Sequence, residues 1–212
     1  MENIDNKIKY KKKPIYSFFK RFFDILLSLL GIILLSWFMI IIAILVKLTS
    51  KGPVFYVSER IGRGEKSFKI YKFRSMKDGA DKEFDALLEQ SDREGTFKMK
   101  NDPRITKFGK FLRRTSIDEL PQLFNVLNGT MSLVGPRPVV KRELETMNEE
   151  EKKRFLVRQG LTCIWQVSGR ADTSFKQQLE LDLKYVEKRG FFYDIWLLIR
   201  TIPAVIFHKG AE

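Results

Sequence analysis

The longest apolar stretch of the chain covers residues 25–46, which are 22 positions without one charged side chain. As an α-helix it would extend about 33 Å, at about 1.5 Å per residue, enough to cross the apolar core of a bilayer. It is too long for the core of a signal peptide, and no small-residue cleavage site follows it. The pattern therefore predicts a membrane helix.

Basic residues flank this stretch on both sides, with Lys20 and Arg21 before it and Lys47 and Lys51 after it. The positive-inside rule places both flanks on the cytoplasmic side of the membrane. A straight span cannot place both flanks there, whereas a re-entrant helix that enters and leaves through the same leaflet can.

A re-entrant helix needs a bend, and the stretch offers two candidate positions for it, Gly31 and Ser36. A serine hydroxyl can bond back to a carbonyl one turn earlier and so help to bend a helix. The stretch contains no proline. The pattern alone therefore leaves the re-entrant and the spanning arrangements open.

The remainder of the chain mixes strand and helix patterns. After Gly52 and Pro53, the apolar positions predict a strand over residues 54–57, a turn over 61–66 and a returning strand over 68–73. Helical spacing predicts helices over residues 81–90, 97–114, 123–127, 143–158, 174–188 and 191–207. The predicted fold is therefore α+β and mainly helical, with a membrane segment at residues 1–50 and a second domain at residues 51–212.

Charge and residue usage restrict the chemistry. The formal net charge of +13 predicts an anionic partner, either a nucleic acid, an anionic lipid or a phosphorylated substrate. The segment at residues 97–114 is basic and amphipathic, which suits an anionic membrane surface or an ordinary surface helix.

The single cysteine, Cys163, excludes an internal disulfide and a Cys-based zinc cluster. With one histidine, His208, a Ser-His-Asp triad is also disfavoured. Chemistry here must depend on carboxylates and basic residues, with a hard cation where phosphates are involved.

Two adjacent acids, Asp118 and Glu119, have both a structural and a chemical interpretation. Ser116 followed by Glu119 matches a capping box at the start of a helix. Pro121 would then occupy an unfavourable position inside that helix, unless Asp118 is the cap. The sequence pattern does not choose between these two caps.

The chemical interpretation depends on the basic residues around the pair, Arg113 and Arg114 before it and Arg137 after it. Guanidinium groups suit phosphate oxygens because each can bind two of them at once. Beside such a cluster we expect the pKa of a carboxyl to be depressed. One acid could then attack phosphorus while the other binds Mg²⁺.

Five ordered blocks together resemble a known family. They are FKIYKFRSM at residues 68–76, DPRIT at 102–106, TSIDELPQL at 115–123, SLVGPRP at 132–138 and WQVSGR at 165–170. The chain resembles the bacterial sugar transferases, also called monotopic polyprenyl-phosphate phosphoglycosyl transferases. The similarity is closest to members that act on galactose 1-phosphate or glucose 1-phosphate.

The resemblance implies a two-step transfer of hexose 1-phosphate from a UDP-hexose to undecaprenyl phosphate with release of UMP. Asp118 matches the family nucleophile, and Glu119 matches the residue that binds Mg²⁺. The basic residues that match the phosphate-binding positions are Lys72, Arg113, Arg137 and, with a less defined role, Arg170.

The resemblance also implies a re-entrant helix hairpin in the cytoplasmic leaflet of the bacterial inner membrane, followed by a small cytosolic catalytic domain with a β-hairpin and amphipathic interfacial helices. The expected partners are a UDP-hexose, polyprenyl phosphate and membrane lipids, with a homodimer left open and no nucleic acid.

The chain departs from the family at Ser36-Trp37, where many members bend at Ser-Pro. It departs again at Gln159 and Cys163, where many members have Pro and Gly. These departures bear on the bend and on sugar preference.

Two other functions compete with the enzyme. The net charge of +13 also suits a membrane-anchored module that binds nucleic acid or anionic lipid, although no nucleic-acid recognition signature is present. A structural scaffold would show no special sensitivity at the acid pair beyond a lost helix cap, about 1 kcal/mol.

Overall fold

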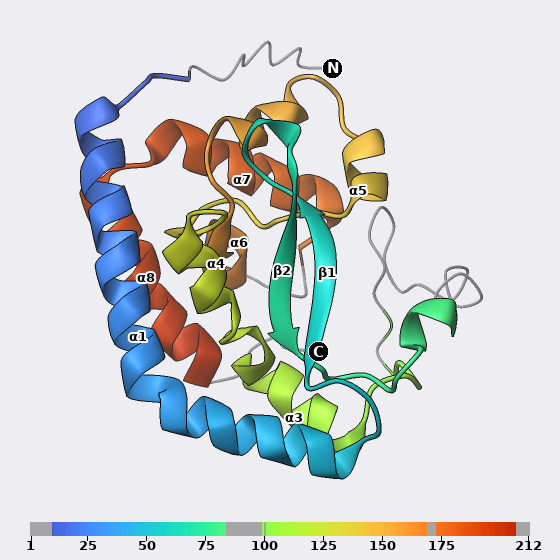
Figure 1. Cartoon of the computed structure of the whole chain (residues 1–212). Coiled ribbons are helices and arrows are strands. Elements are labelled where there is room, and N and C mark those ends of the chain that lie inside the picture. Colours follow the sequence, from blue (N-terminus) through green and yellow to red (C-terminus); the bar gives the residue numbers. More distant parts are fainter. Residues whose placement is uncertain (1–9, 84–98, 100, 169–172, 207–212) are drawn as a thin grey trace.

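The computed structural model describes residues 10–83, 99, 101–168 and 173–206. Its first element is α1 (Pro14–Thr49), which begins with a proline at its first position, where a missing N–H costs nothing. Figure 1 shows α1 running down one side of the molecule and then turning beneath it. The described part of the predicted membrane segment thus contains one continuous helix with a bend.

Helix α1 is long and apolar enough to cross a membrane by length and composition. Many of its large side chains are exposed, among them Phe18, Leu34 and Trp37. The hydroxyl of Ser36 donates to the carbonyl of Ile33 at 2.9 Å, the back-bond expected at a bend. The topology of α1 in a membrane stays a prediction.

Polar contacts join the first half of α1 to the rest of the chain. Arg21 donates to the carbonyls of Val126 and Leu127 at 2.6 and 2.8 Å. These carbonyls lie in the last turn of α4 (Gln122–Asn128), where cations are favourable. Asp24 accepts from the Leu133 N–H at 2.9 Å, at the centre of β3 (Ser132–Val134).

The predicted hairpin is confirmed as β1 (Phe55–Ile61) and β2 (Ser67–Phe73), which pair antiparallel. Its turn is a short 3-10 segment, Arg63–Glu65, in which Gly64 has a φ of +67°. This left-handed conformation favours glycine. A second, parallel pair joins β3 to β4 (Gly160–Thr162).

Two of the predicted helices are wrong in extent. Helix α3 (Lys107–Arg114) begins at its Thr106 cap and not at residue 97. The helix predicted over residues 143–158 is two pieces, α5 (Lys141–Glu145) and a 3-10 segment, Glu151–Leu156. Asn148 and Glu151 exchange side chain–backbone hydrogen bonds, which starts the second piece anew and separates it from the first. The helix predicted over 81–90 lies mostly outside the described residues, which show a 3-10 turn, Ala80–Glu83.

The C-terminal helices match their predictions. Helix α7 (Phe175–Lys188) starts at a capping box formed by Ser174 and Gln177. It follows α6 (Ile164–Ser168) and leads into α8 (Phe191–Ile206). Tyr185 and Leu197 from these helices share a core with Val134 and Ile164. The fold is α+β and mainly helical, as predicted.

Candidate active site

The acid pair lies in a short 3-10 turn, Ile117–Glu119, between α3 and α4. Ser116 enters this turn in the left-handed conformation, with a φ of +57°, and its side chain makes no capping hydrogen bond. The N-cap of α4 is Pro121, again without a side-chain cap. Both versions of the capping interpretation are therefore wrong. A left-handed serine costs free energy and concentrates at functional sites.

Lys72 of β2 pairs with both acids. Its Nζ lies 2.6 Å from Oε1 of Glu119 and 4.0 Å from Oδ2 of Asp118. Asp118 is only 6% exposed. Burial raises the pKa of Asp118 to about 6, against the opposing charge of Lys72 and with a further increase from Glu119. The expectation of a depressed pKa is therefore wrong, because desolvation of the carboxylate outweighs its cationic neighbours.

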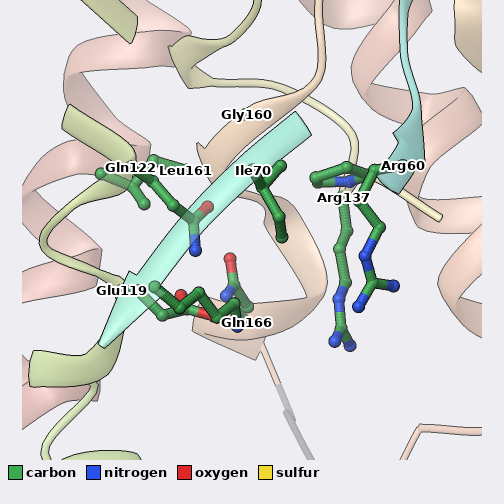
Figure 2. Close-up of a pocket in the computed structure, with 10 residues that line it drawn as sticks. Arg60, Ile70, Glu119, Gln122, Arg137, Gly160, Leu161 and Gln166 are labelled. Atoms are coloured by element: carbon green, nitrogen blue, oxygen red, sulfur yellow. Dashed lines mark hydrogen bonds and ion pairs between the residues drawn. The ribbon is translucent and has the colours of Figure 1, made fainter. Parts of the chain in front are cut away.

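A cleft opens beside this pair and contains about 330 Å³ of space, part of it open to solvent. One of its walls is a face of the hairpin. Because Arg60 pairs with Phe68 in the β1–β2 register, Arg60 shares a face with Ile70 and Lys72, which follow Phe68 at intervals of two. All three side chains line the cleft together with Glu119. Figure 2 shows Glu119 on one side of it and the guanidinium groups of Arg60 and Arg137 on the other.

Arg137 is held in the cleft by its backbone and by its side chain. Its carbonyl accepts from Nη2 of Arg154 at 2.5 Å, and that same nitrogen binds Asp182 at 2.5 Å. Since the ion pair between Arg154 and Asp182 is buried, it holds the backbone of Arg137 in a fixed place. Its guanidinium lies over the ring of Trp165, 5.4 Å from the ring centre.

The structure thus gathers Lys72, Asp118, Glu119 and Arg137 into one site. Arg113 does not line the cleft, but its charge lowers the pKa of Asp118. Arg170 lies outside the described residues.

Sequence reasoning missed three polar or charged residues that line the cleft, namely Arg60, Gln122 and Gln166. The strand predicted at residues 54–57 stopped short of Arg60, so its alternation could not be extended to that position. Gln166 accepts from the Cys163 N–H at 2.9 Å and from its Sγ at 3.1 Å. One departure from the family pattern therefore contacts a residue of the site.

A second, apolar cavity adjoins the cleft. It contains about 1030 Å³ of space, open solvent included. Its walls come from α1, the acid turn and α8, through Phe38, Ile117 and Leu198 among others. Glu119 and Gln166 line both the cleft and this cavity. Glu119 therefore stands where a cationic cleft meets an apolar surface beside α1, with Asp118 next to it in the chain.

The donor set near the acid pair fits a hard cation. Within the described part of the chain, no three His, Cys, Asp or Glu side chains gather at one place. Mg²⁺, however, commonly binds one or two carboxylates and takes its other ligands from water and substrate phosphates. The Asp118 and Glu119 carboxylates match this requirement.

Comparison with known proteins finds similar sequences along nearly the whole chain. The family model for bacterial sugar transferases matches residues 15–208. The exopolysaccharide production protein ExoY of Rhizobium meliloti (strain 1021) is 41% identical over 204 residues, covering 94% of this chain and 90% of the relative.

Longer relatives match over less than half of their own length. The undecaprenyl-phosphate galactose phosphotransferase of Salmonella typhimurium is 43% identical over 199 residues, covering 92% of this chain and 42% of the relative. The UDP-glucose:undecaprenyl-phosphate glucose-1-phosphate transferase of Escherichia coli (strain K12) is 38% identical over 200 residues, covering 91% of this chain and 41% of the relative. The chain therefore belongs to the bacterial sugar transferase family.

Proposed function

We propose that the protein transfers hexose 1-phosphate, with galactose or glucose as the sugar, from a UDP-sugar to undecaprenyl phosphate. This would be the first membrane step in building a polysaccharide or glycan. The observation that carries the proposal is the position of Glu119, which lines both a cationic cleft and an apolar cavity, with Asp118 beside it and Lys72 paired with both acids. The cleft suits a nucleotide diphosphate, and the cavity suits a polyprenyl chain. The names of the relatives agree with both substrates.

In the first step, a carboxylate oxygen of Asp118 attacks the phosphorus that carries the sugar. A bond forms between that oxygen and phosphorus, and the bond from the same phosphorus to the bridging oxygen of the diphosphate breaks. UMP leaves with the bridging oxygen, and a sugar-phosphoryl group remains on Asp118. Lys72 supports this step because its ammonium, 4.0 Å from Asp118, can neutralise phosphate oxygens as the anions approach.

In the second step, a phosphate oxygen of undecaprenyl phosphate attacks the same phosphorus. A new diphosphate bond forms, the bond to Asp118 breaks, and the carboxylate is regenerated. The apolar cavity favours this step because it touches Glu119 and extends between α1 and α8. A lipid lying there would present its phosphate to the acid turn.

Glu119 would hold Mg²⁺, which leaves Asp118 to act as the nucleophile. The ion would supply positive charge to the phosphate oxygens of the bound substrate. Lys72 pairs with Glu119 at 2.6 Å and so keeps its carboxylate oriented toward the cleft.

We also propose that α1 is re-entrant and places the site at the cytoplasmic face of the bacterial inner membrane. Exposed apolar side chains on α1 and on α8, such as Leu34 and Phe192, support a membrane-facing surface. Single cysteines replacing Lys12 and Lys51 would be labelled from the same side of the membrane in cells or oriented vesicles. Labelling from opposite sides would contradict the re-entrant arrangement.

The test of the reaction is UMP release by purified protein in lipid nanodiscs containing undecaprenyl phosphate and Mg²⁺. The panel of donors consists of UDP-galactose, UDP-glucose and UDP-N-acetylgalactosamine. We expect turnover with galactose or glucose and none for Asp118→Asn. The matched control, Asp78→Asn, makes the same chemical change at an exposed carboxyl and should keep full activity. Binding without turnover for every donor would favour the anionic-ligand binding module.

The covalent step has a separate test. UDP-galactose or UDP-glucose labelled with ³²P in the sugar-linked phosphate is added without undecaprenyl phosphate, and the protein is then denatured. Label should remain on the wild-type chain and be absent from Asp118→Asn. Equal labelling of both would remove Asp118 as the nucleophile.

A further inference from the structure

Arg60 is a cleft residue that has no role in the reaction as derived above. The next residue, Ile61, is buried in the core, and its N–H donates to the Val139 carbonyl at 2.8 Å. This bridge fixes the end of β1 against the chain that follows Arg137. Since neighbouring side chains on a strand face opposite ways, Arg60 is directed into the cleft.

Two arginines therefore share one wall of the cleft. Figure 2 shows the side chains of Arg60 and Arg137 extending side by side in the same direction, across the cleft from Glu119. Burial lowers the pKa of Arg60, and the charge of Arg137 lowers it further, whereas Glu143 and Glu119 oppose this effect. The arrangement brings two like charges together in a partly dry site, which costs free energy in the empty protein.

The side chain of Arg60 also carries an unused donor. Among the described residues, its Nε is buried and has no hydrogen-bond partner. A buried donor left unpaired is costly, so such a group points to a partner that arrives from outside the chain. A phosphate fits best, because a guanidinium fork donates to two phosphate oxygens at once.

We propose that Arg60 and Arg137 together bind the phosphate that departs with the nucleoside when Asp118 attacks. This inference rests on the proposed function and assigns a place to the second phosphate of the diphosphate. Lys72 and the acid turn form the side of the cleft where the sugar-linked phosphate is attacked. The two arginines form the other side. The bond that breaks runs between the two phosphates, and its electron pair goes to the departing phosphate. Arg60 and Arg137 then neutralise the charge that develops there.

The test uses UMP as the probe, because UMP carries the departing phosphate, with uridine as the matched probe without it. Arg60→Gln should weaken UMP binding about 10- to 100-fold, as expected for the loss of a charge-assisted hydrogen bond. It should leave uridine binding unchanged. Lys69→Gln removes the same charge from the same hairpin, on its exposed opposite face, and should leave UMP binding unchanged. An equal loss in both variants would show that only net charge matters and would overturn the assignment.

Thermal stability of the empty protein separates binding from a structural role. Arg60→Gln removes the repulsion with Arg137, so we expect its Tm without ligand to equal or exceed that of the wild type. The gain in Tm on adding UMP should be larger for the wild type than for the variant. Arg60→Lys, which keeps the charge but loses the fork, should bind UMP with intermediate affinity. A lower Tm for the empty Arg60→Gln variant together with unchanged UMP binding would make Arg60 a structural residue.

The same preparations distinguish this inference from the proposed function. A wild-type protein that binds UMP but releases none from any UDP-sugar would contradict the proposed function. A wild type that turns over, with Arg60→Gln matching it in kcat/KM and in UMP inhibition, would contradict the assignment of Arg60 alone.

Discussion

Replacing Asp118 with asparagine should abolish turnover and at the same time stabilise the unliganded protein at neutral and alkaline pH. The pKa of Asp118 is raised from 3.8 to about 6 by burial. Each pKa unit corresponds to about 1.4 kcal/mol, so the ionised carboxylate costs the folded protein about 3 kcal/mol at pH 8. Asparagine has nearly the same shape and carries no charge. A buried amide with incomplete hydrogen bonding costs about 1 kcal/mol, which leaves a gain of about 2 kcal/mol.

The sign of the pH dependence follows from the direction of the pKa shift. Because the pKa is higher in the folded than in the unfolded chain, the folded protein holds its proton more tightly. Wild-type stability should therefore fall as the pH rises from about 4 to about 6 and stay lower above that range. Asparagine does not titrate. The advantage of Asp118→Asn should thus be largest at pH 8 and turn, near pH 4, into a deficit of about 1 kcal/mol, which is the cost of the buried amide.

The assay is the Tm of wild type and variant in nanodiscs, followed by intrinsic tryptophan fluorescence between pH 4 and pH 8. For a chain of this length, a gain of about 2 kcal/mol corresponds to a rise of roughly 4–8 °C in Tm. Asp78→Asn, at an exposed position, should show no such rise. A variant less stable than the wild type at pH 8, by a margin that grows with pH, would refute the reasoning. Asp118 would then be stabilised in its ionised form.

Three further outcomes follow from particular contacts. The rate of UMP release should decline as the pH falls through about 6, because protonated Asp118 cannot attack phosphorus; a pH profile of kcat checks this. Gly109→Ala should destabilise the protein by about 1–3 kcal/mol, measured as a Tm shift, because its Cβ would lie 1.8 Å from the Ser75 carbonyl oxygen. Leu112→Ala should cost about 2–5 kcal/mol in denaturant unfolding, because Leu112 is 0% exposed in the core between α1 and α3.

The sequence pattern located several elements well. The apolar stretch at residues 25–46 lies within α1, and the alternation at residues 68–73 lies within β2. These patterns are local, because a helix or strand displays its own period wherever it packs. The break between α5 and the 3-10 segment at Glu151–Leu156 escaped prediction, because reciprocal hydrogen bonds between Asn148 and Glu151 override the local helical pattern.

The family blocks pointed to the acid pair, but the conformation of that pair was not readable from the sequence. Ser116 and Glu119 match a capping box in sequence, yet Ser116 adopts a left-handed conformation and caps nothing. The capping interpretation paired the Glu119 carboxylate with the backbone. In the structure this carboxylate pairs instead with Lys72, which lies 47 positions away in the chain. Local and long-range partners compete for the same carboxylate, and only the folded chain shows which one it binds.

What the sequence by itself determined was the apolar helix, the hairpin and the residues with the chemistry for phosphoryl transfer. The tertiary structure decided three other features, namely the raised pKa of Asp118, the entry of Arg60 into the cleft and the meeting of that cleft with an apolar cavity. Each of these depends on burial or on neighbouring charges that come together only when segments distant along the chain pack against one another. Periodicity and residue type describe a side chain, whereas burial and neighbouring charge exist only after the segments have packed together.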